Sequence, residues 1–359
     1  MNKFGTALFL TTLFLTFTGL FILYESSSYT AFLHIGDKYY FIKNQSLWIC
    51  IGIISALIFS RINYKIYKKL SLPFLIGTFV LLLAVFIPGI GLQLKGAHRW
   101  INLGFTVLQP SELLKITLTL YLAAWLSSSE KKKFISFLGL LGFCVGLVIV
   151  EPDLGTATII GATSIFVYFY SGAKIREFIW IVAVFMIAIA LLIAIAPYRA
   201  ARFAAFMNFD SSDFSTTSYH VKQILISVGS GGLTGVGIGN SVQKYAYLPE
   251  NTTDSIFAIF AEETGFIGST FLLLVYFAQL MLGFLISLHS KDTFGRLLSF
   301  GIIIFIGIQA VINIASQVVL FPLTGVPLPF ISYGGSAMVI NFVSVGILMS
   351  VSKFSDGKK

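Results

Sequence analysis

Charged residues are scarce in this chain of 359 residues. They make up 11% of it, whereas soluble domains average about 25%. Apolar residues make up 57%, and the mean hydropathy is +0.90. These values exclude a soluble globular enzyme, and equally a disordered or collagen-like chain. They predict an all-α polytopic membrane protein with a single domain, residues 1–359.

Cysteine and histidine are also rare. The two cysteines, Cys50 and Cys144, each lie in an apolar run, which argues against a disulfide framework. The four histidines are scattered along the chain. The sequence contains no Walker loop, no dinucleotide-binding fingerprint and no HExxH motif, so no cofactor is assigned and no metal site is readable.

Ten apolar runs approach the length that crosses a bilayer, whose apolar core of about 30 Å takes roughly 20 helical residues. The first run exceeds the apolar core of a signal peptide and lacks its cleavage pattern, so we expect it to be a retained span. The runs cover about 5–24, 46–60, 71–89, 110–127, 134–150, 156–171, 178–197, 255–287, 297–320 and 335–351.

Basic residues divide unevenly between the two sides that these spans define. One set of loops carries 15 of the 24 lysines and arginines, including Lys131–Lys133, against four acidic residues. The other set carries the remaining nine basic and eleven acidic residues. Because cytoplasmic loops are enriched in lysine and arginine, the first set predicts the cytoplasmic side, with both termini inside.

Polar segments gather on the opposite, external side. The longest is the large loop at 198–254, and loops of that length are usually functional. Within it we expect a short helix at 219–228 and a glycine-rich turn region at 229–239. Three prolines and three glycines between Pro322 and Gly335 exclude a continuous helix, so that backbone must be buried in protein or line a wet cavity.

Glu112 and Lys115 share one helix face. Two interpretations stand: a membrane-interface cap with a snorkelling lysine, or a buried pair that orders the external vestibule. Gln309, Asn313 and Gln317 are spaced by four, so we expect them to share a face that points into the bundle. That face has two interpretations: it forms hydrogen bonds between helices and has no chemical role, or it contributes to the functional site.

Glu151 and Asp153 flank a proline at the external boundary between two spans. Uncompensated carboxylates at that depth are costly, so both are expected to need cationic partners, for which Arg99 and Lys115 are candidates. The alternative is a tight turn in which Asp153 caps the following helix.

Asp254 stands where the long loop enters the eighth run, and Glu262 and Glu263 follow within that run. A charge in mid-membrane costs on the order of 3 kcal/mol, so the two glutamates require a polar cavity or protein partners. Asp254 has two interpretations: a helix N-cap, or a carboxylate with a chemical role at the external face.

Five motifs, in this order and spacing, resemble those of the SEDS family (shape, elongation, division and sporulation), whose members are multispan peptidoglycan glycosyltransferases. The resemblance covers nearly the whole chain. The motifs are GAHRW at 96–100, QPSELLK at 109–115, EPDLGT at 151–156, the YLPE…D…FA…EE.G block at 247–265 and PLTGVPLPFISYGGS at 322–336.

The resemblance implies an inverting glycosyltransferase that polymerises lipid II, a disaccharide-peptide on a polyprenyl pyrophosphate. Asp254 matches the family's catalytic position and is the expected general base. External cations would stabilise the departing pyrophosphate, and a divalent cation, Mg²⁺ or Mn²⁺, could share that work. The residues expected to bind substrate are Lys95, Arg99, Glu151, Asp153, Arg199, Arg202, Lys244, Ser332, Gly334 and Gly335, with Ser332 and the two glycines presenting backbone N–H groups to phosphate. Those expected to shape the cavity are Glu112, Lys115, Glu262, Glu263 and Asn313.

The phrase GNSVQK at 239–244 favours the division-type branch and a septal location in the bacterial cytoplasmic membrane. The run Pro322-Leu323-Thr324-Gly325 departs from that branch, which keeps an elongation-type role open. A lipid II flippase is the alternative from another class, but it would need a path from the cytoplasmic side. The resemblance also implies partners: the growing glycan strand, a class B penicillin-binding transpeptidase and other membrane proteins of the division machinery, but no nucleic acid.

Overall fold

The computed structural model describes residues 3–94, 96–104, 106–128, 134–207 and 216–355. The helices and strands in these ranges are, in chain order, α1 (Lys3–Ile35), α2 (Tyr40–Arg61), α3 (Lys65–Ala84), β1 (Gly91–Leu94), β2 (Ala97–Asn102), β3 (Val107–Leu108), α4 (Pro110–Leu126), α5 (Phe134–Val150), α6 (Leu154–Tyr170), α7 (Ile175–Ile195), α8 (Pro197–Met207), α9 (Thr216–Ser230), α10 (Ile256–His289), α11 (Thr293–Gln317) and α12 (Gly335–Ser355).

Each of the ten apolar runs is a helix, from α1 to α7 and from α10 to α12. Seven of the described helices are long and apolar enough to cross a membrane, and α5 and α6 are shorter apolar helices. Large apolar side chains cover the outer faces; on α7, Trp180 and Ile187 are 62% and 60% exposed. Such a surface suits lipid rather than water. The chain is therefore a polytopic membrane helical bundle, while the count of ten spans stays a prediction.

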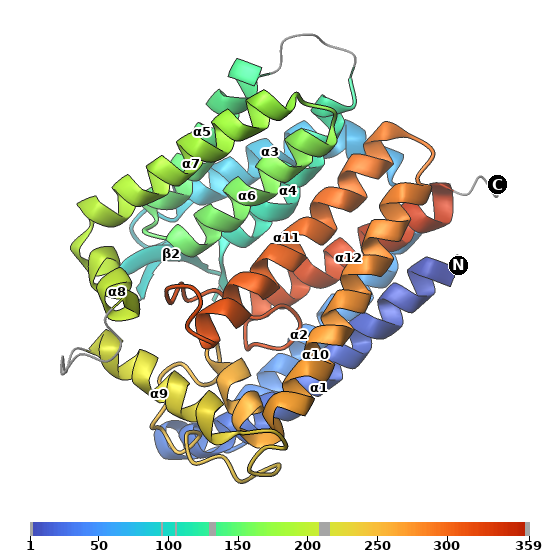
Figure 1. Ribbon diagram of the computed structural model, residues 1–359. Coiled ribbons are helices and arrows are strands. Elements are labelled where there is room, and N and C mark those ends of the chain that lie inside the picture. The colour runs from blue at the N-terminus through green and yellow to red at the C-terminus, as the bar shows by residue number, and fades with distance from the viewer. Residues whose placement is uncertain (1–2, 95, 105, 129–133, 208–215, 356–359) are drawn as a thin grey trace.

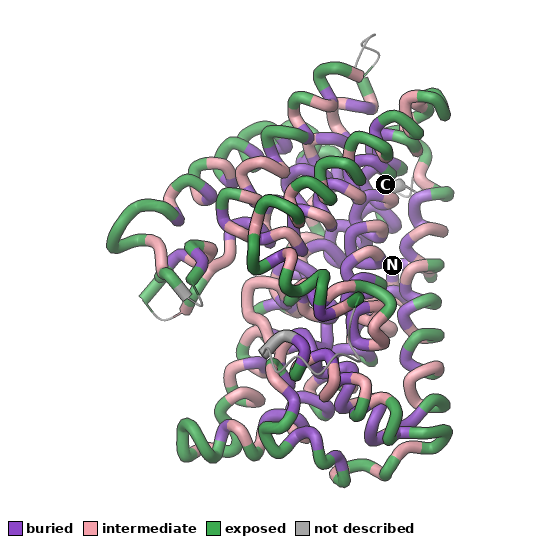
Figure 2. Tube along the Cα trace, turned by 60° about the vertical axis from the view of Figure 1, so that its left-hand side comes forward, coloured by how far each residue is buried: buried purple, intermediate pink, exposed green. Residues whose placement is uncertain are grey.

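The bundle is organised around α11, which packs against α4, α6, α10 and α12 (Figure 1). Buried residues concentrate in the middle of the bundle, and exposed ones follow the outer helices (Figure 2). Helix α7 lies at the margin, where it packs on α6 and leads into α8. Both termini lie at one end of the bundle, and α9 lies toward the other end. This arrangement agrees with termini on a shared side, although the orientation across the membrane stays a prediction.

A small antiparallel sheet, in the order β1-β2-β3, was not expected from the sequence and adds strands to the predicted all-α fold. Gly91 of β1 pairs with Ile101 of β2. A Cβ on Gly91 would lie 1.7 Å from the carbonyl oxygen of Val85, so the close approach there requires glycine. The sheet brings Arg99 on β2 to the turn between α5 and α6, where its guanidinium donates to the carbonyl of Glu151 at 2.9 Å.

The long loop at 198–254, predicted to be external, contains more regular structure than expected. Helix α9 covers the expected helix at 219–228, but α8 was not foreseen, because its short amphipathic sequence follows the apolar α7 directly. The predicted irregular backbone at 321–334 is confirmed, since no helix begins there until Gly335.

The glycine-rich segment after α9 packs on the backbone of α10. That helix kinks at Gly265, which has φ +65° and ψ −163°. Near the kink, the Phe266 N–H donates to the carbonyl of Gly232 at 2.9 Å, and the Val236 N–H donates to the carbonyl of Glu262 at 3.0 Å. A Cβ at Gly265 would lie within 2.7 Å of this segment. The glycines therefore allow two backbones to touch, and the contact fixes the loop to α10.

Candidate active site

A cavity of about 570 Å³ lies where the loop before α10 meets the sheet, α8 and the proline-rich segment 321–334. Asp254 is part of its wall and is 8% exposed. All five sequence motifs contribute to this wall. Its other polar and aromatic members are Trp48, Arg99, Trp100, Thr106, Gln109, Tyr198, Arg202, Glu250, Thr253, Thr324, Tyr333 and Ser336.

Asp254 is anchored through its backbone. The side-chain amide of Asn313 donates to the carbonyl of Asp254 at 2.8 Å and to the carbonyl of Val326 at 2.8 Å. The N-cap of α10 is Ser255, and no side chain caps that helix. The N-cap interpretation of Asp254 is therefore wrong. Its carboxylate accepts a hydrogen bond from the Thr253 hydroxyl at 3.3 Å and is not committed to the helix end.

The surroundings of Asp254 favour a carboxylate that accepts protons readily. Burial raises the pKa of Asp254 to about 6, and the like charge of Glu250 acts in the same direction, whereas Arg202 opposes both. Burial lowers the pKa of His220 to about 4, so this imidazole is neutral at pH 7; its Nε2 lies 2.8 Å from the Ser255 hydroxyl. Asp254 is thus largely ionised at neutral pH and a stronger base than an ordinary aspartate.

An apolar groove of about 430 Å³ between α6 and α7 adjoins the cavity. The Arg99 guanidinium also donates to the carbonyl of Pro152. Arg202 donates to the carbonyl of Leu323 at 3.3 Å. Two guanidinium groups therefore stand where a polar space meets an apolar one. The residues that line both spaces are Arg99, Pro152, Tyr198, Arg202 and Thr324.

The carboxylates of Glu151 and Asp153 do not have the cationic partners expected for them. Asp153 accepts from the Thr156 N–H at 3.0 Å and from the Gln109 amide at 3.2 Å, so it caps α6, as the alternative predicted. Arg99 bonds the backbone of Glu151 rather than its carboxylate. Burial raises the pKa of Glu151 to about 8, so the group is mostly neutral at pH 7 and needs no cation. Neither residue lines the cavity.

Glu112 and Lys115 form a buried ion pair, 2.7 Å between Oε2 and Nζ, with both residues 3% exposed. The interface-cap interpretation is therefore wrong. Lys115 also donates to Gln309 at 2.6 Å, and Gln309 donates to a backbone carbonyl of the proline-rich segment at 2.9 Å. Gln309, Asn313 and Gln317 are all fully buried, so the inward orientation of their face is confirmed. These contacts link α4, through α11, to the wall of the cavity.

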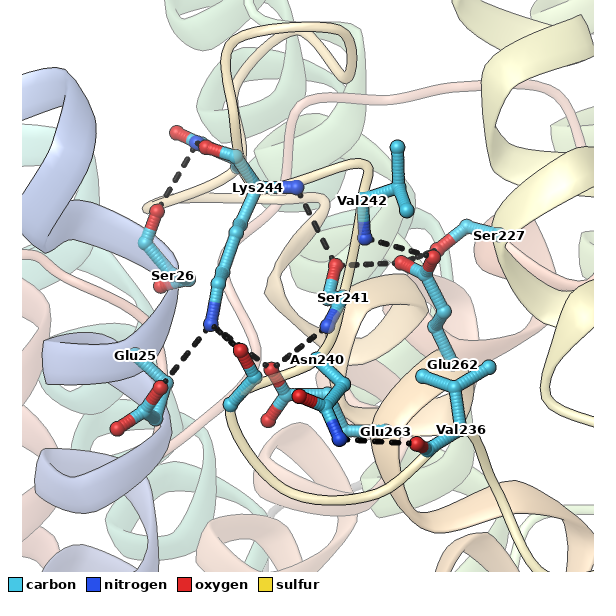
Figure 3. A network of polar contacts seen from close by, with 12 residues as sticks. Glu25, Ser26, Ser227, Val236, Asn240, Ser241, Val242, Lys244, Glu262 and Glu263 are labelled. Atoms are coloured by element: carbon cyan, nitrogen blue, oxygen red, sulfur yellow. Dashed lines mark hydrogen bonds and ion pairs between the residues drawn. The ribbon is translucent and has the colours of Figure 1, made fainter.

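Glu262 and Glu263 hold the long loop onto α10 (Figure 3). Glu262 accepts from the Ser241 hydroxyl at 2.5 Å. Glu263 pairs with Lys244 at 3.4 Å, and Lys244 also pairs with Glu25 of α1 at 3.2 Å. The glutamates thus have the protein partners that their depth requires. Lys244 is committed to this network and does not line the cavity, so the structure gives no support to a substrate-binding role for it.

Two of the three backbone N–H groups expected to bind phosphate are already engaged within the protein. The Ser332 N–H donates to the carbonyl of Leu328 at 3.0 Å, and the Gly334 N–H donates to Gln45 at 3.3 Å. Gly335 packs on Trp48, where a Cβ would lie 2.6 Å from the indole. A phosphate cradle at Ser332 and Gly334 is therefore wrong, because buried irregular backbone must satisfy its own polar groups. Both glycines still line the cavity.

Two further residues were predicted to bind substrate, Lys95 and Arg199. Lys95 lies outside the described residues. Arg199 donates to the Tyr198 hydroxyl at 2.8 Å and lines the apolar groove instead. Among the described residues no three His, Cys, Asp or Glu side chains gather in a metal site. Glu250 and Asp254 nevertheless suit Mg²⁺, which takes one or two carboxylates together with substrate phosphates. A divalent cation therefore stays a prediction.

Several wall residues were not singled out from the sequence, among them Trp48, Tyr198 and Glu250. Glu250 lies in the YLPE phrase, and an acidic residue four positions before Asp254 was an available signal. Trp48 lies inside an apolar run and Tyr198 at the end of another, where an aromatic residue is common in any membrane protein. No signal in the sequence distinguishes them.

The family model described as "Cell cycle protein", which covers the FtsW, RodA and SpoVE proteins, matches residues 6–357. The chain is 37% identical over 350 residues to stage V sporulation protein E of Bacillus subtilis, covering 96% of this chain and 95% of that one. It is 36% identical to the probable peptidoglycan glycosyltransferase FtsW of Geobacter sp. strain M18, covering 94% of each.

Two solved structures share the fold. One is a chain of a peptidoglycan synthase complex, with a TM-score of 0.78, 24% identity and coverage of 97% of this chain and 98% of that one. The other is the rod shape determining protein RodA of Thermus thermophilus, with a TM-score of 0.74, 24% identity and coverage of 100% and 99%. Sequence and fold agree: the chain belongs to the FtsW/RodA/SpoVE family.

Proposed function

We propose that this protein polymerises lipid II into glycan strands at the external face of the bacterial cytoplasmic membrane, with Asp254 as the general base. Membership of the family makes the chain a peptidoglycan glycosyltransferase, the activity named in its FtsW relatives. One observation carries the proposal furthest: the cavity that contains Asp254 adjoins an apolar groove, and two arginines stand at the junction.

This arrangement fits a substrate that is polar at one end and lipid at the other. The polyprenyl chain lies in the groove between α6 and α7, whose wall is mainly apolar. The pyrophosphate lies at the junction, beside Arg99 and Arg202, since guanidinium groups bind phosphate through paired N–H donors. The sugars then occupy the cavity, within reach of Asp254.

The reaction follows from these positions. Asp254 accepts the proton of the attacking sugar 4-hydroxyl while that oxygen forms a bond to the anomeric carbon of the lipid-linked donor. The bond from the anomeric carbon to the pyrophosphate oxygen breaks, and the configuration inverts. Arg99 and Arg202 stabilise the negative charge that the departing pyrophosphate gains.

A direct test is polymerisation of purified lipid II by the purified protein in detergent, with the glycan products separated by length. We expect polymer from the wild-type chain and a loss of at least about tenfold in Arg202→Gln, which corresponds to about 1.4 kcal/mol of transition-state stabilisation. Lys43→Gln is the matched control, because Lys43 is an exposed cation paired with Asp37 and does not line the cavity. Transfer of lipid II across vesicles without any polymer would favour the flippase alternative.

The division role rests on the GNSVQK phrase at 239–244. Within this phrase Ser241 donates to Glu262 and Lys244 pairs with Glu263, so the phrase is part of the contact that holds the long loop on α10. We propose septal synthesis together with a class B penicillin-binding transpeptidase that crosslinks the product. Depletion in rod-shaped cells should give filaments. Rounded cells would instead indicate the elongation-type role.

A further inference from the structure

The cavity that contains Asp254 is too small for a polymer. Its volume is about 570 Å³, a size that holds one compact ligand rather than a chain of many sugars. The growing strand must therefore leave across part of the cavity wall, and the residues that it crosses must accept a chain of any length. On the side of α2 this wall contains two aromatic residues, Trp48 and Tyr333.

Tyr333 is fixed in this wall by bonds to two different elements. Its N–H donates at 3.0 Å to the carbonyl of Thr252, two residues before the candidate base. Gln45 of α2 donates to the carbonyl of Ser332 at 3.1 Å and accepts from the N–H of Gly334 at 3.3 Å. The position of Tyr333 is therefore defined relative both to the loop before α10 and to α2.

From Tyr333 a series of aromatic rings continues out of the cavity. Phe41 of α2 packs edge-on against Tyr333, with ring centroids 5.0 Å apart, and Tyr40 packs edge-on against Phe41 at 5.4 Å. Tyr39, the next residue, stacks on Tyr24 of α1 at 5.8 Å. Phe41 is half-buried, whereas Tyr40 and Tyr39 are 40% and 42% exposed. We call this series, which runs from the cavity wall to the surface, the aromatic track: Tyr333, Phe41, Tyr40 and Tyr39.

Aromatic rings suit a sugar chain as a ligand. The C–H groups on one face of a sugar ring pack on an aromatic face, which carries partial negative charge, while the sugar hydroxyls keep their contact with water. Such contacts need no fixed register, so a strand can move from ring to ring as it grows. The aromatic track ends at the turn between α1 and α2, on the side predicted to be external, where a glycan strand has to go.

Aromatic residues also anchor membrane proteins at the membrane–water interface, whatever their function. Tyr29 of α1 fits that description: it is 39% exposed and packs edge-on against Tyr245 of the long loop, with ring centroids 5.0 Å apart. Neither of these two residues lines the cavity. The aromatic track differs from such an anchor because its first ring is part of the cavity wall.

We propose that the aromatic track is the path along which the growing glycan strand leaves the cavity, with Tyr40 and Tyr39 as its outer binding residues. This inference rests on the proposed function, because it takes the sugar polymer as the ligand. The track retains the strand between additions and slows its release, so more disaccharides are added to each strand.

The first test is the length of the strands made from purified lipid II. Tyr40→Leu keeps an apolar side chain but removes the flat ring, and should shorten the mean strand about threefold or more. Tyr40→Trp keeps an aromatic face and should retain the wild-type length. Tyr29→Leu is the matched control for an interfacial tyrosine and should also retain it. Wild-type length in Tyr40→Leu, or an equal shortening in Tyr40→Trp, would contradict the inference.

The second test needs no synthesis, so it separates this inference from the proposed function. Fluorescence anisotropy measures the Kd of labelled, lipid-free glycan strands, with the free disaccharide as the short probe. Strands should bind the wild-type protein more tightly than the disaccharide does, and Tyr40→Leu should weaken strand binding about threefold or more. That result supports the track even if the wild-type protein fails to polymerise lipid II.

Equal strand affinity in Tyr40→Leu and wild type overturns the inference, whatever the activity. If Tyr40→Leu does not fold, Tyr39→Leu decides, and an unchanged strand affinity there overturns it. Tyr40 is the first choice because the ring of Tyr39 also has Tyr24 stacked on it and Lys38 Nζ 4.9 Å from its centroid.

Discussion

One side-chain amide, that of Asn313 on α11, bonds the carbonyl oxygens of Asp254 and Val326 at 2.8 Å each. The first carbonyl belongs to the loop before α10, and the second to the proline-rich segment 321–334. Asn313 is fully buried. Asn313 therefore bridges two segments of the cavity wall that are far apart in the sequence, and the Tyr333 N–H, which donates to the carbonyl of Thr252 at 3.0 Å, joins the same two segments directly.

Replacing Asn313 with leucine should lower glycan synthesis about tenfold or more. Each buried carbonyl that loses its donor costs about 1–3 kcal/mol, and the position of Asp254 relaxes with it. The measurement is lipid II polymerisation together with thermal unfolding in detergent. Gln317→Leu is the control, because the Gln317 amide contacts Ser316 of its own helix at 3.4 Å. Equal activity in the two variants would contradict the role of Asn313.

The Glu112–Lys115 pair should behave as a buried pair in stability measurements. Lys115→Ala leaves the Glu112 carboxylate uncompensated, which typically costs about 3–5 kcal/mol. The double variant Glu112→Gln with Lys115→Met should recover part of this loss, because no buried charge remains. Thermal unfolding in detergent measures both. Wild-type stability in Lys115→Ala would show that the pair is hydrated instead.

The network of Lys244 predicts a local opening rather than a loss of fold. Its side chain is 8% exposed and pairs with Glu25 and Glu263. Lys244→Met should increase amide hydrogen exchange across 231–244, because the loop loses its ion pairs to α1 and α10 and the two carboxylates are left without their cation. Lys43→Met is the matched control: its side chain is 65% exposed and pairs with Asp37, and exposed pairs contribute little. Unchanged exchange in Lys244→Met would contradict the anchoring role.

The helices were predictable from the sequence because each apolar run must be helical to satisfy its backbone in lipid. The sheet was not, because its strands have only four, six and two residues, too few to show a periodicity, and its first strand depends on the close approach of Gly91 to the backbone of Val85. Among site residues, the sequence identified carboxylates and cations on the side predicted to be external. It could not show that Lys244 is already paired with a carboxylate of the protein. Nor could it show that the backbone N–H of Ser332 already donates to a backbone carbonyl.

The same limit explains the mixed outcome at the turn between α5 and α6. The sequence showed that two carboxylates at the membrane boundary are costly. It did not show that Asp153 is satisfied by capping α6, or that burial raises the pKa of Glu151 to about 8. Capping and protonation depend on the local three-dimensional surroundings, and either one removes the need for a cation.

The predicted orientation can be tested by cysteine labelling in a background without Cys50 and Cys144. Asp37→Cys should react with a membrane-impermeant thiol reagent in intact spheroplasts, and Lys291→Cys only after permeabilisation. Lys291 is exposed, the side chain of Asp37 is 41% exposed, and both residues lie between helices. The reason is the excess of basic residues on one side of the predicted spans. The reverse pattern would contradict the external position of the Asp254 cavity.

The central claim is that the Asp254 carboxylate accepts a proton during glycan synthesis. Asparagine matches its size and keeps the backbone bond from Asn313, but it cannot accept that proton. Removal of a general base typically costs about 10²–10⁴-fold. The measurement is lipid II polymerisation by purified Asp254→Asn with a wild-type melting curve. We predict a loss of at least about a hundredfold, and a folded variant that retains more than about a third of wild-type activity would contradict the account, since that falls far short of the expected loss.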